Sequence, residues 1–128
     1  MVPLLPGSAK ARLHFAGWGP TANQLVFIFE NNVYFKSSVE DNPIKLTSSS
    51  TDSYIYNGIP DWLYEEEILS SSDAIWWSPD GSKLCFASFN DSLVDTVSYS
   101  IYGNDLNQPY PSIFDLKYPK VSKTASSL

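Results

Sequence analysis

The chain has 128 residues, of which 43% are apolar and 15% aromatic, so it can bury one core and is not intrinsically disordered. Fourteen acidic residues against eight basic ones give a net charge of −6, which argues against the basic face that nucleic-acid binding requires. The chain shows no transmembrane run, and residues 1–7 lack the basic start and the apolar length of a signal peptide, so we expect neither anchor nor export signal in it.

The first part of the chain predicts a four-stranded antiparallel unit. Leu25–Phe29 is a continuous apolar run of β-forming residues, as expected for a strand that is buried on both faces. Glu30–Asn32 is expected to be a tight turn, because asparagine tolerates positive φ. The other three strands are expected at Leu13–Trp18, Val33–Lys36 and Ile44–Thr47.

A short helix is expected in the middle of the chain. Tyr54–Tyr56 has the composition of a strand, and Asn57-Gly58 predicts a turn after it. Asp61 can act as the N-cap of a helix over Trp62–Leu69, with its glutamates near the positive end of the helix dipole. Because that helix has only about two turns, it depends on tertiary packing for its stability.

A second unit of strands follows the helix. Ser78–Gly81 reads as a type I turn, with proline in the second position and glycine in the fourth. Strands are expected on both sides of this turn, at Ala74–Trp77 and Leu84–Phe89. A turn at Asn90-Asp91 then leads into a strand over Thr96–Tyr102.

The two units repeat a common pattern. Trp18-Gly19-Pro20 aligns with Trp77-Ser78-Pro79 at an offset of 59 residues. The same offset places three later residues on identical ones, namely Leu25 on Leu84, Phe27 on Phe86 and Asn31 on Asn90. Fixed-period self-similarity is typical of repeat architectures. We therefore predict an all-β fold, a partial β-propeller of about two four-stranded antiparallel blades with a short inserted helix near residues 61–69; a two-sheet sandwich is the alternative.

Isolated reactive side chains give no sign of catalysis or metal binding. Cys85 lies in an apolar strand and is predicted to be a buried small side chain. His14 has no nucleophile motif near it and is predicted to be structural or exposed. The histidine, the cysteine and the carboxylates do not follow metal-ligand spacing, so we expect neither a metal nor a cofactor.

The acidic stretch Asp61–Glu67 is the candidate binding site. It contains four carboxylates in seven residues, interleaved with two aromatic residues and a leucine. Carboxylates held beside bulky apolar side chains are suited to a small cation, such as the protonated amine of a peptide. Successive helical residues point about 100° apart, so two adjacent glutamates can flank one small group but three cannot share a direction. The alternative is a solvated acidic helix face.

Five motifs, in this order along the chain, resemble the dipeptidyl peptidase IV family. They are Tyr56-Asn57-Gly58, Asp61-Trp62-Leu63-Tyr64-Glu65-Glu66-Glu67, Trp76-Trp77-Ser78-Pro79-Asp80-Gly81, Phe89-Asn90-Asp91-Ser92 and Tyr118-Pro119-Lys120. The resemblance covers about residues 12–120, and segments 1–11 and 121–128 are expected to lie outside the family pattern. The string with three glutamates is its most specific part.

The resemblance implies a function in proteolysis. Members of this family are extracellular glycoproteins, membrane-anchored or secreted and often dimeric, in which a propeller covers an α/β-hydrolase domain with a Ser-Asp-His triad. The active members release dipeptides from peptide N-termini. The resemblance assigns the substrate's free α-amine to Glu66 and Glu67 and leaves Glu65 structural or exposed. Asn90-Asp91-Ser92 is a sequon, so the resemblance also makes Asn90 a candidate for glycosylation.

The chain carries no catalytic residue of its own. It lacks the Gly-x-Ser-x-Gly nucleophile elbow, so we expect it to be inactive without a hydrolase domain and the neighbouring blades. A second branch of the family has lost the catalytic serine and serves as auxiliary subunits of voltage-gated potassium channels. Gly17–Pro20, Phe29–Asn32 and Trp62–Tyr64 look closer to that branch. The glutamates do not discriminate between the branches, and the alternative function is a non-catalytic interaction protein.

Overall fold

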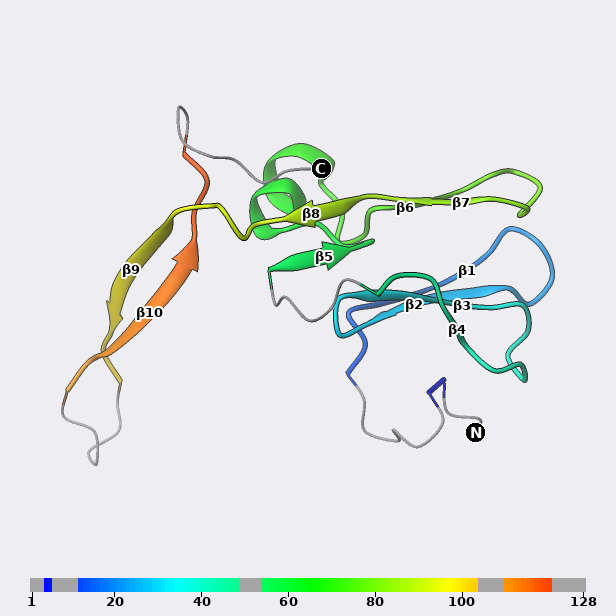
Figure 1. Ribbon diagram of the computed structural model, residues 1–128, viewed down its shortest axis with the longest axis horizontal. Helices are drawn as coiled ribbons and strands as arrows, with labels where there is room; N and C mark the ends of the chain where they lie inside the picture. Colours follow the sequence, from blue (N-terminus) through cyan, green and yellow to red (C-terminus); the bar gives the residue numbers. More distant parts are fainter. Residues whose placement is uncertain (1–3, 6–11, 49–53, 104–109, 121–128) are drawn as a thin grey trace.

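The computed structural model describes residues 4–5, 12–48, 54–103 and 110–120. Within them the regular secondary structure consists of antiparallel strands and one short helix, as predicted (Figure 1). None of the helical segments in these ranges is long and apolar enough to cross a membrane. The elements are β1 (Phe15–Trp18), β2 (Leu25–Phe29), β3 (Asn32–Lys36), β4 (Ile44–Lys45), β5 (Ile55–Asn57), the helix η1 (Tyr64–Leu69), β6 (Ile75–Trp77), β7 (Leu84–Phe86), β8 (Ser88–Asn90), β9 (Thr96–Ile101) and β10 (Ser112–Lys117).

The first sheet confirms the predicted four-stranded meander. Its strand order is β1-β2-β3-β4, with every neighbouring pair antiparallel. Leu25–Ile28 in β2 are buried, in agreement with a strand covered on both faces. The turn between β2 and β3 has positive φ at Glu30 (48°) and Asn31 (58°), which is the conformation of the tight turns that suit twisted hairpins.

The sequence repeat corresponds to a repeated hairpin. Trp18 pairs with Leu25 next to the turn that joins β1 and β2, and Trp77 pairs with Leu84 in the same way in β6–β7. In the second hairpin the predicted turn closes with a hydrogen bond from the Gly81 N–H to the Ser78 carbonyl, at 2.9 Å. The common register explains why tryptophan and leucine recur at one offset.

The second unit is divided where the first is continuous. In place of one four-stranded sheet, the described strands of this unit form the pairs β5–β8, β6–β7 and β9–β10. Strands β7 and β8 follow one another with a break at Ala87, whose N–H donates to the Ala74 carbonyl at 3.0 Å. Gly58 donates to Ala87 and accepts from Ala74, both at 2.8 Å. Gly58, next to the end of β5, and Ala74, next to the start of β6, are therefore adjacent. The residues between them form an insertion that carries η1 and separates the two strands.

Strands β9 and β10 form an arm that extends away from the rest of the molecule (Figure 1). Their register runs from Thr96 opposite Lys117 to Ile101 opposite Ser112. Apolar side chains remain exposed along it, and the rings of Tyr99 and Phe114 lie across the strands from each other, tilted, with their centroids 5.4 Å apart. Strand β10 was not predicted from the sequence, and its partner β9 is one residue shorter than expected.

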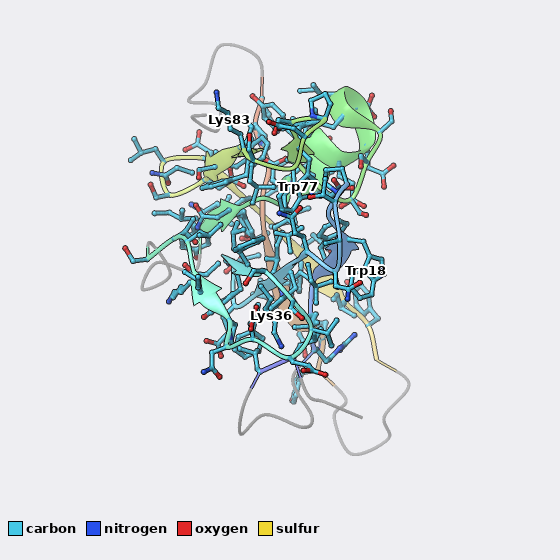
Figure 2. All side chains as sticks on the ribbon, turned by 90° about the vertical axis from the view of Figure 1, so that its right-hand side faces the viewer. Trp18, Lys36, Trp77 and Lys83 are labelled. Carbon is cyan, nitrogen blue, oxygen red and sulfur yellow. The ribbon has the colours of Figure 1, made fainter. Side chains whose placement is uncertain are left out.

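The core lies between the first sheet and the second unit. It consists of Val26, Ile28, Val33, Ile59 and Ile75, with partly buried aromatic side chains packed around them. Burying a side chain of this size contributes roughly 1.5–3 kcal/mol. Figure 2 shows Trp77 between Lys36 of the first sheet and Lys83 of the β6–β7 turn, and its ring lies 6.1 Å from that of Phe35.

The prediction that Cys85 is buried was wrong, because the thiol is exposed. Cys85 lies opposite Trp76 in the β6–β7 register, and Trp76 is also exposed. Alternate residues of a strand face opposite ways. Leu84 and Phe86 pack against the core, so the residue between them faces outward. The exposed position of His14 agrees with its prediction.

Candidate functional site

The helix that carries the three glutamates is short, wide and capped. Asp61 is its cap, as predicted, because its Oδ1 accepts the Tyr64 N–H at 2.8 Å and its carbonyl accepts the Glu65 N–H at 2.9 Å. The segment begins with helical residues Trp62 and Leu63 and continues as the π-helix η1. Ser70 ends it in the left-handed conformation (φ 49°, ψ 36°). A π-helix closes i→i+5 hydrogen bonds and occurs often at functional sites.

All three glutamates point into solvent. Glu65, Glu66 and Glu67 are exposed and form the first turn of η1. Two of them, Glu65 and Glu66, line an open depression of about 280 Å³ whose remaining wall is the serine run Ser70–Ser72. Glu67 follows in the chain but does not line this depression. The structure thus brings Glu65 and Glu66 to one depression, so Glu65 becomes a further candidate beside the predicted Glu66 and Glu67.

This arrangement can accept hydrogen bonds from a cation. Carboxylates and serine hydroxyls around one depression offer acceptor oxygens to the three N–H groups of an ammonium. Charge-assisted hydrogen bonds of this kind are about twice as strong as neutral ones. The described residues hold no group of three or more His, Cys, Asp or Glu side chains that could bind a metal ion.

Aromatic side chains attach η1 to the neighbouring strands. The Tyr64 ring packs against that of Phe89 at 4.8 Å, which ties the helix to β8. The Trp62 indole N–H donates to the Lys117 carbonyl at 3.0 Å, and its ring lies 5.0 Å from that of Tyr118. The helix is therefore attached both to β8 and to the foot of the β9–β10 arm, which is the end of the arm at Thr96 and Lys117.

Replacing Trp62 with phenylalanine tests this attachment. The ring contact with Tyr118 is largely kept, whereas the hydrogen bond to the Lys117 carbonyl is lost. We expect a loss of about 1 kcal/mol in the free energy of unfolding, the usual contribution of one hydrogen bond. Amide hydrogen exchange in β10 should also rise relative to β2. Equal exchange in the variant and the original chain would show that Trp62 does not hold the arm.

The sequon residue Asn90 is the last residue of β8 and is partly buried. Its Oδ1 accepts the Ser92 N–H at 3.0 Å, and a turn closed by the Val94 N–H and the Asp91 carbonyl follows. The position differs from the predicted one, since Asn90 precedes the turn instead of forming it. The strand ends here because the chain leaves β5 and enters the arm.

The whole chain matches one family of known proteins. The model of the family described as "Dipeptidyl peptidase IV (DPP IV) N-terminal region" matches residues 1–128. The chain belongs to the dipeptidyl peptidase IV family. The matched region includes both terminal segments of the chain.

Relatives of different activity within this family are similarly close. "Prolyl endopeptidase FAP" of Bos taurus is 40% identical over 108 residues, covering 84% of this chain and 14% of that protein. "Inactive dipeptidyl peptidase 10" of Mus musculus is 43% identical over 116 residues, covering 91% and 14%. "Dipeptidyl peptidase 4" of Felis catus is 41% identical over 103 residues, covering 80% and 13%. The chain thus spans about one seventh of the length of these relatives.

Solved structures agree with the fold. The crystal structure of Porphyromonas gingivalis dipeptidyl peptidase 4 superposes with a TM-score of 0.77 at 27% identity, covering 97% of this chain and 17% of that one. A dipeptidyl aminopeptidase IV from Bacteroides ovatus gives a TM-score of 0.63 at 18% identity, covering 89% and 14%. The all-β propeller-type fold predicted from the repeat is therefore confirmed, and the sandwich alternative is set aside.

Proposed function

We propose that this chain is the part of a dipeptidyl peptidase IV-like exopeptidase that recognises the free N-terminal amine of a peptide, through Glu66 and Glu67. The observation that carries the proposal is the presentation of consecutive exposed carboxylates on a short helix fixed by Asp61 and Trp62. Anchoring matters because a site held in place loses little conformational entropy when it binds its ligand.

The chemistry explains the specificity that this function requires. A peptide N-terminus carries a positive charge below its pKa of about 8, whereas an internal peptide segment has no charge at the corresponding position. Two carboxylates that flank the ammonium of an N-terminus form charge-assisted hydrogen bonds with it. With an internal segment, the same carboxylates lose water and gain no charged partner. Such a pair therefore selects exopeptidase substrates.

The whole protein would supply the remaining parts. A Ser-Asp-His triad would come from a hydrolase domain and the walls of the cavity from neighbouring blades, because the described strands form only part of a propeller. We further propose an extracellular setting, anchored to the membrane or secreted, and a homodimer as the assembled form. A glycan on Asn90, the partly buried last residue of β8, belongs to the same proposal.

A non-catalytic protein is the second candidate. It is favoured by the 43% identity to a relative named as inactive, which is no lower than the identity to the active ones. In that case the propeller would serve as an interaction surface, with a voltage-gated potassium channel subunit as its partner. The helix with its glutamates would then be an inherited feature without a substrate.

One experiment separates the two candidates. The chain is expressed together with the segments that follow it in its gene, and the product is treated with a fluorophosphonate probe and a chromogenic Xaa-Pro substrate. The exopeptidase proposal predicts labelling of one serine and release of the dipeptide, but no cleavage after the substrate's amine is acetylated. A folded product with neither labelling nor release would contradict it and support the non-catalytic candidate.

A further inference from the structure

Two buried carboxyl groups lie close together near the start of η1, the helix that carries the three glutamates. Asp61, which precedes the helix, is 5% exposed, and Asp91, which follows β8, is 3% exposed. One oxygen of each, Asp61 Oδ2 and Asp91 Oδ1, is buried without a hydrogen-bond donor among the described groups. Two ionised carboxylates buried together would repel each other and would each lack compensation for the loss of water.

The groups that surround the pair do not neutralise it fully. A cavity of about 300 Å³ at this point is lined by both aspartates, by Tyr54 and Tyr56 of the β5 segment, and by Asp115 and Lys117 of β10. Lys117 is the one ammonium group in this lining. Its Nζ donates to the carbonyls of Ser92 (3.3 Å) and Val94 (2.7 Å) and lies 4.8 Å from the centre of the Tyr54 ring. Lys117 is thus bonded elsewhere, and the buried oxygens Asp61 Oδ2 and Asp91 Oδ1 still lack a hydrogen-bond donor within the described part of the chain.

We propose that Asp61 and Asp91 share one proton, and that this carboxyl–carboxylate pair joins the cap of η1 to the foot of the β9–β10 arm. The two aspartates are well placed for this role. Asp61 caps the helix through the Tyr64 N–H, and Asp91 begins the turn into the arm through the Val94 N–H. A proton between them gives each buried oxygen a partner and removes one negative charge.

The pair makes the junction sensitive to pH. Burial, followed by the negative charge of Asp61 and its hydrogen bond, raises the pKa of Asp91 from 3.8 to about 6, while Lys117 acts in the opposite direction. Burial and then the charges of Asp91, Asp61 and Tyr54 also raise the pKa of Tyr56. The pKa of Asp91 is higher in the folded state than in the unfolded one. Its contribution to the free energy of unfolding is therefore fully present below pH 4 and is lost as the pH rises through about 6.

Loss of the proton should loosen a defined set of contacts. Two negative charges then face each other between the helix cap and the arm, next to the hydrogen bond from the Trp62 indole to the Lys117 carbonyl. That bond should open more often at pH 8 than at pH 5. A resulting change in amine binding by Glu66 and Glu67 would rest on the proposed function, but the junction itself does not.

NMR spectroscopy on the chain tests the proposal without any ligand. We expect the carboxyl carbon of Asp91 to titrate with a midpoint near pH 6. The ratio of Trp62 indole hydrogen-exchange rates, original chain over Asp91→Asn, should rise about tenfold between pH 5 and pH 8. Asp61→Asn should suppress the same rise while keeping a capping side chain. Asp41→Asn, an exposed carboxylate bonded to Ser37, is the control and should change nothing.

Three results would overturn the proposal. Titration of both carboxyl groups below pH 4.5 would show that no proton is shared. A Trp62 exchange ratio that stays constant with pH would show that the pair does not control the junction. A shift of both carboxyl resonances on addition of 1 mM Ca²⁺ in millimolar buffer (roughly the range of weak extracellular sites) would identify a cation site instead.

Discussion

The double variant Glu66→Gln/Glu67→Gln is expected to bind peptides with a free N-terminus roughly 100-fold more weakly than the original protein. Each substitution keeps the shape of the side chain and removes one charge-assisted hydrogen bond, which contributes about 1.5–3 kcal/mol. The glutamates are exposed, so we take the lower end of that range, about tenfold for each substitution. Calorimetric titration with an Xaa-Pro peptide measures the effect.

Glu65→Gln is the matched control for this experiment. Glu65 is one residue away, is equally exposed and carries the same charge, so it changes the local field by a similar amount. The amine assignment predicts that its affinity stays within about twofold of the original. If Glu65→Gln is weakened and Glu67→Gln is not, the amine lies in the depression formed by Glu65, Glu66 and the serine run, and the assignment to Glu67 is wrong.

Replacing Gly58 with alanine is expected to destabilise the fold by about 3 kcal/mol. Gly58 has φ +73°, a conformation that costs other residues roughly 1 kcal/mol or more. An added Cβ would also lie 3.0 Å from Ile28, Val33 and Ile75, all of which belong to the core cluster, and overpacking costs about 1–3 kcal/mol. Urea unfolding followed by circular dichroism measures the loss.

Gly17→Ala is the control for the Gly58 experiment. Its nearest contact would be the tip of the Phe15 ring at 2.8 Å, which can rotate away, and its backbone does not have positive φ. We expect a change of less than about 1 kcal/mol there. Equal losses at the two glycines would show that the junction of β5 with Ala74 and Ala87 is not strained by a side chain.

The parts of the fold that the sequence predicted well depend on local patterns. The β2 run Leu25–Phe29 and the turn at Ser78–Gly81 were predicted from composition and turn chemistry alone. The repeat succeeded for the same reason, since a common hairpin register requires Trp and Leu at matching positions. The cap at Asp61 is equally local, because it joins residues three positions apart.

The parts that were missed depend on long-range contacts. Strand β10 has exposed apolar residues and is stabilised by its pairing with β9, which no local pattern shows. The interruption of the strand at Gly58 and Ala74 arises from hydrogen bonds between distant residues. Asp91 was read only as part of a turn and a sequon, and its burial against Asp61 follows from packing across the fold. The residues around either aspartate in the sequence give no sign that the two side chains lie close together in the fold.

The binding of one peptide in two forms tests the central claim most directly. An Xaa-Pro peptide and its N-acetylated counterpart are titrated into the protein at pH 6.5, where the amine is almost fully charged. If Glu66 and Glu67 recognise the amine, the free peptide should bind at least tenfold more tightly, and the difference should vanish in the double glutamine variant. Equal affinity of the two peptides for the original protein would contradict the account.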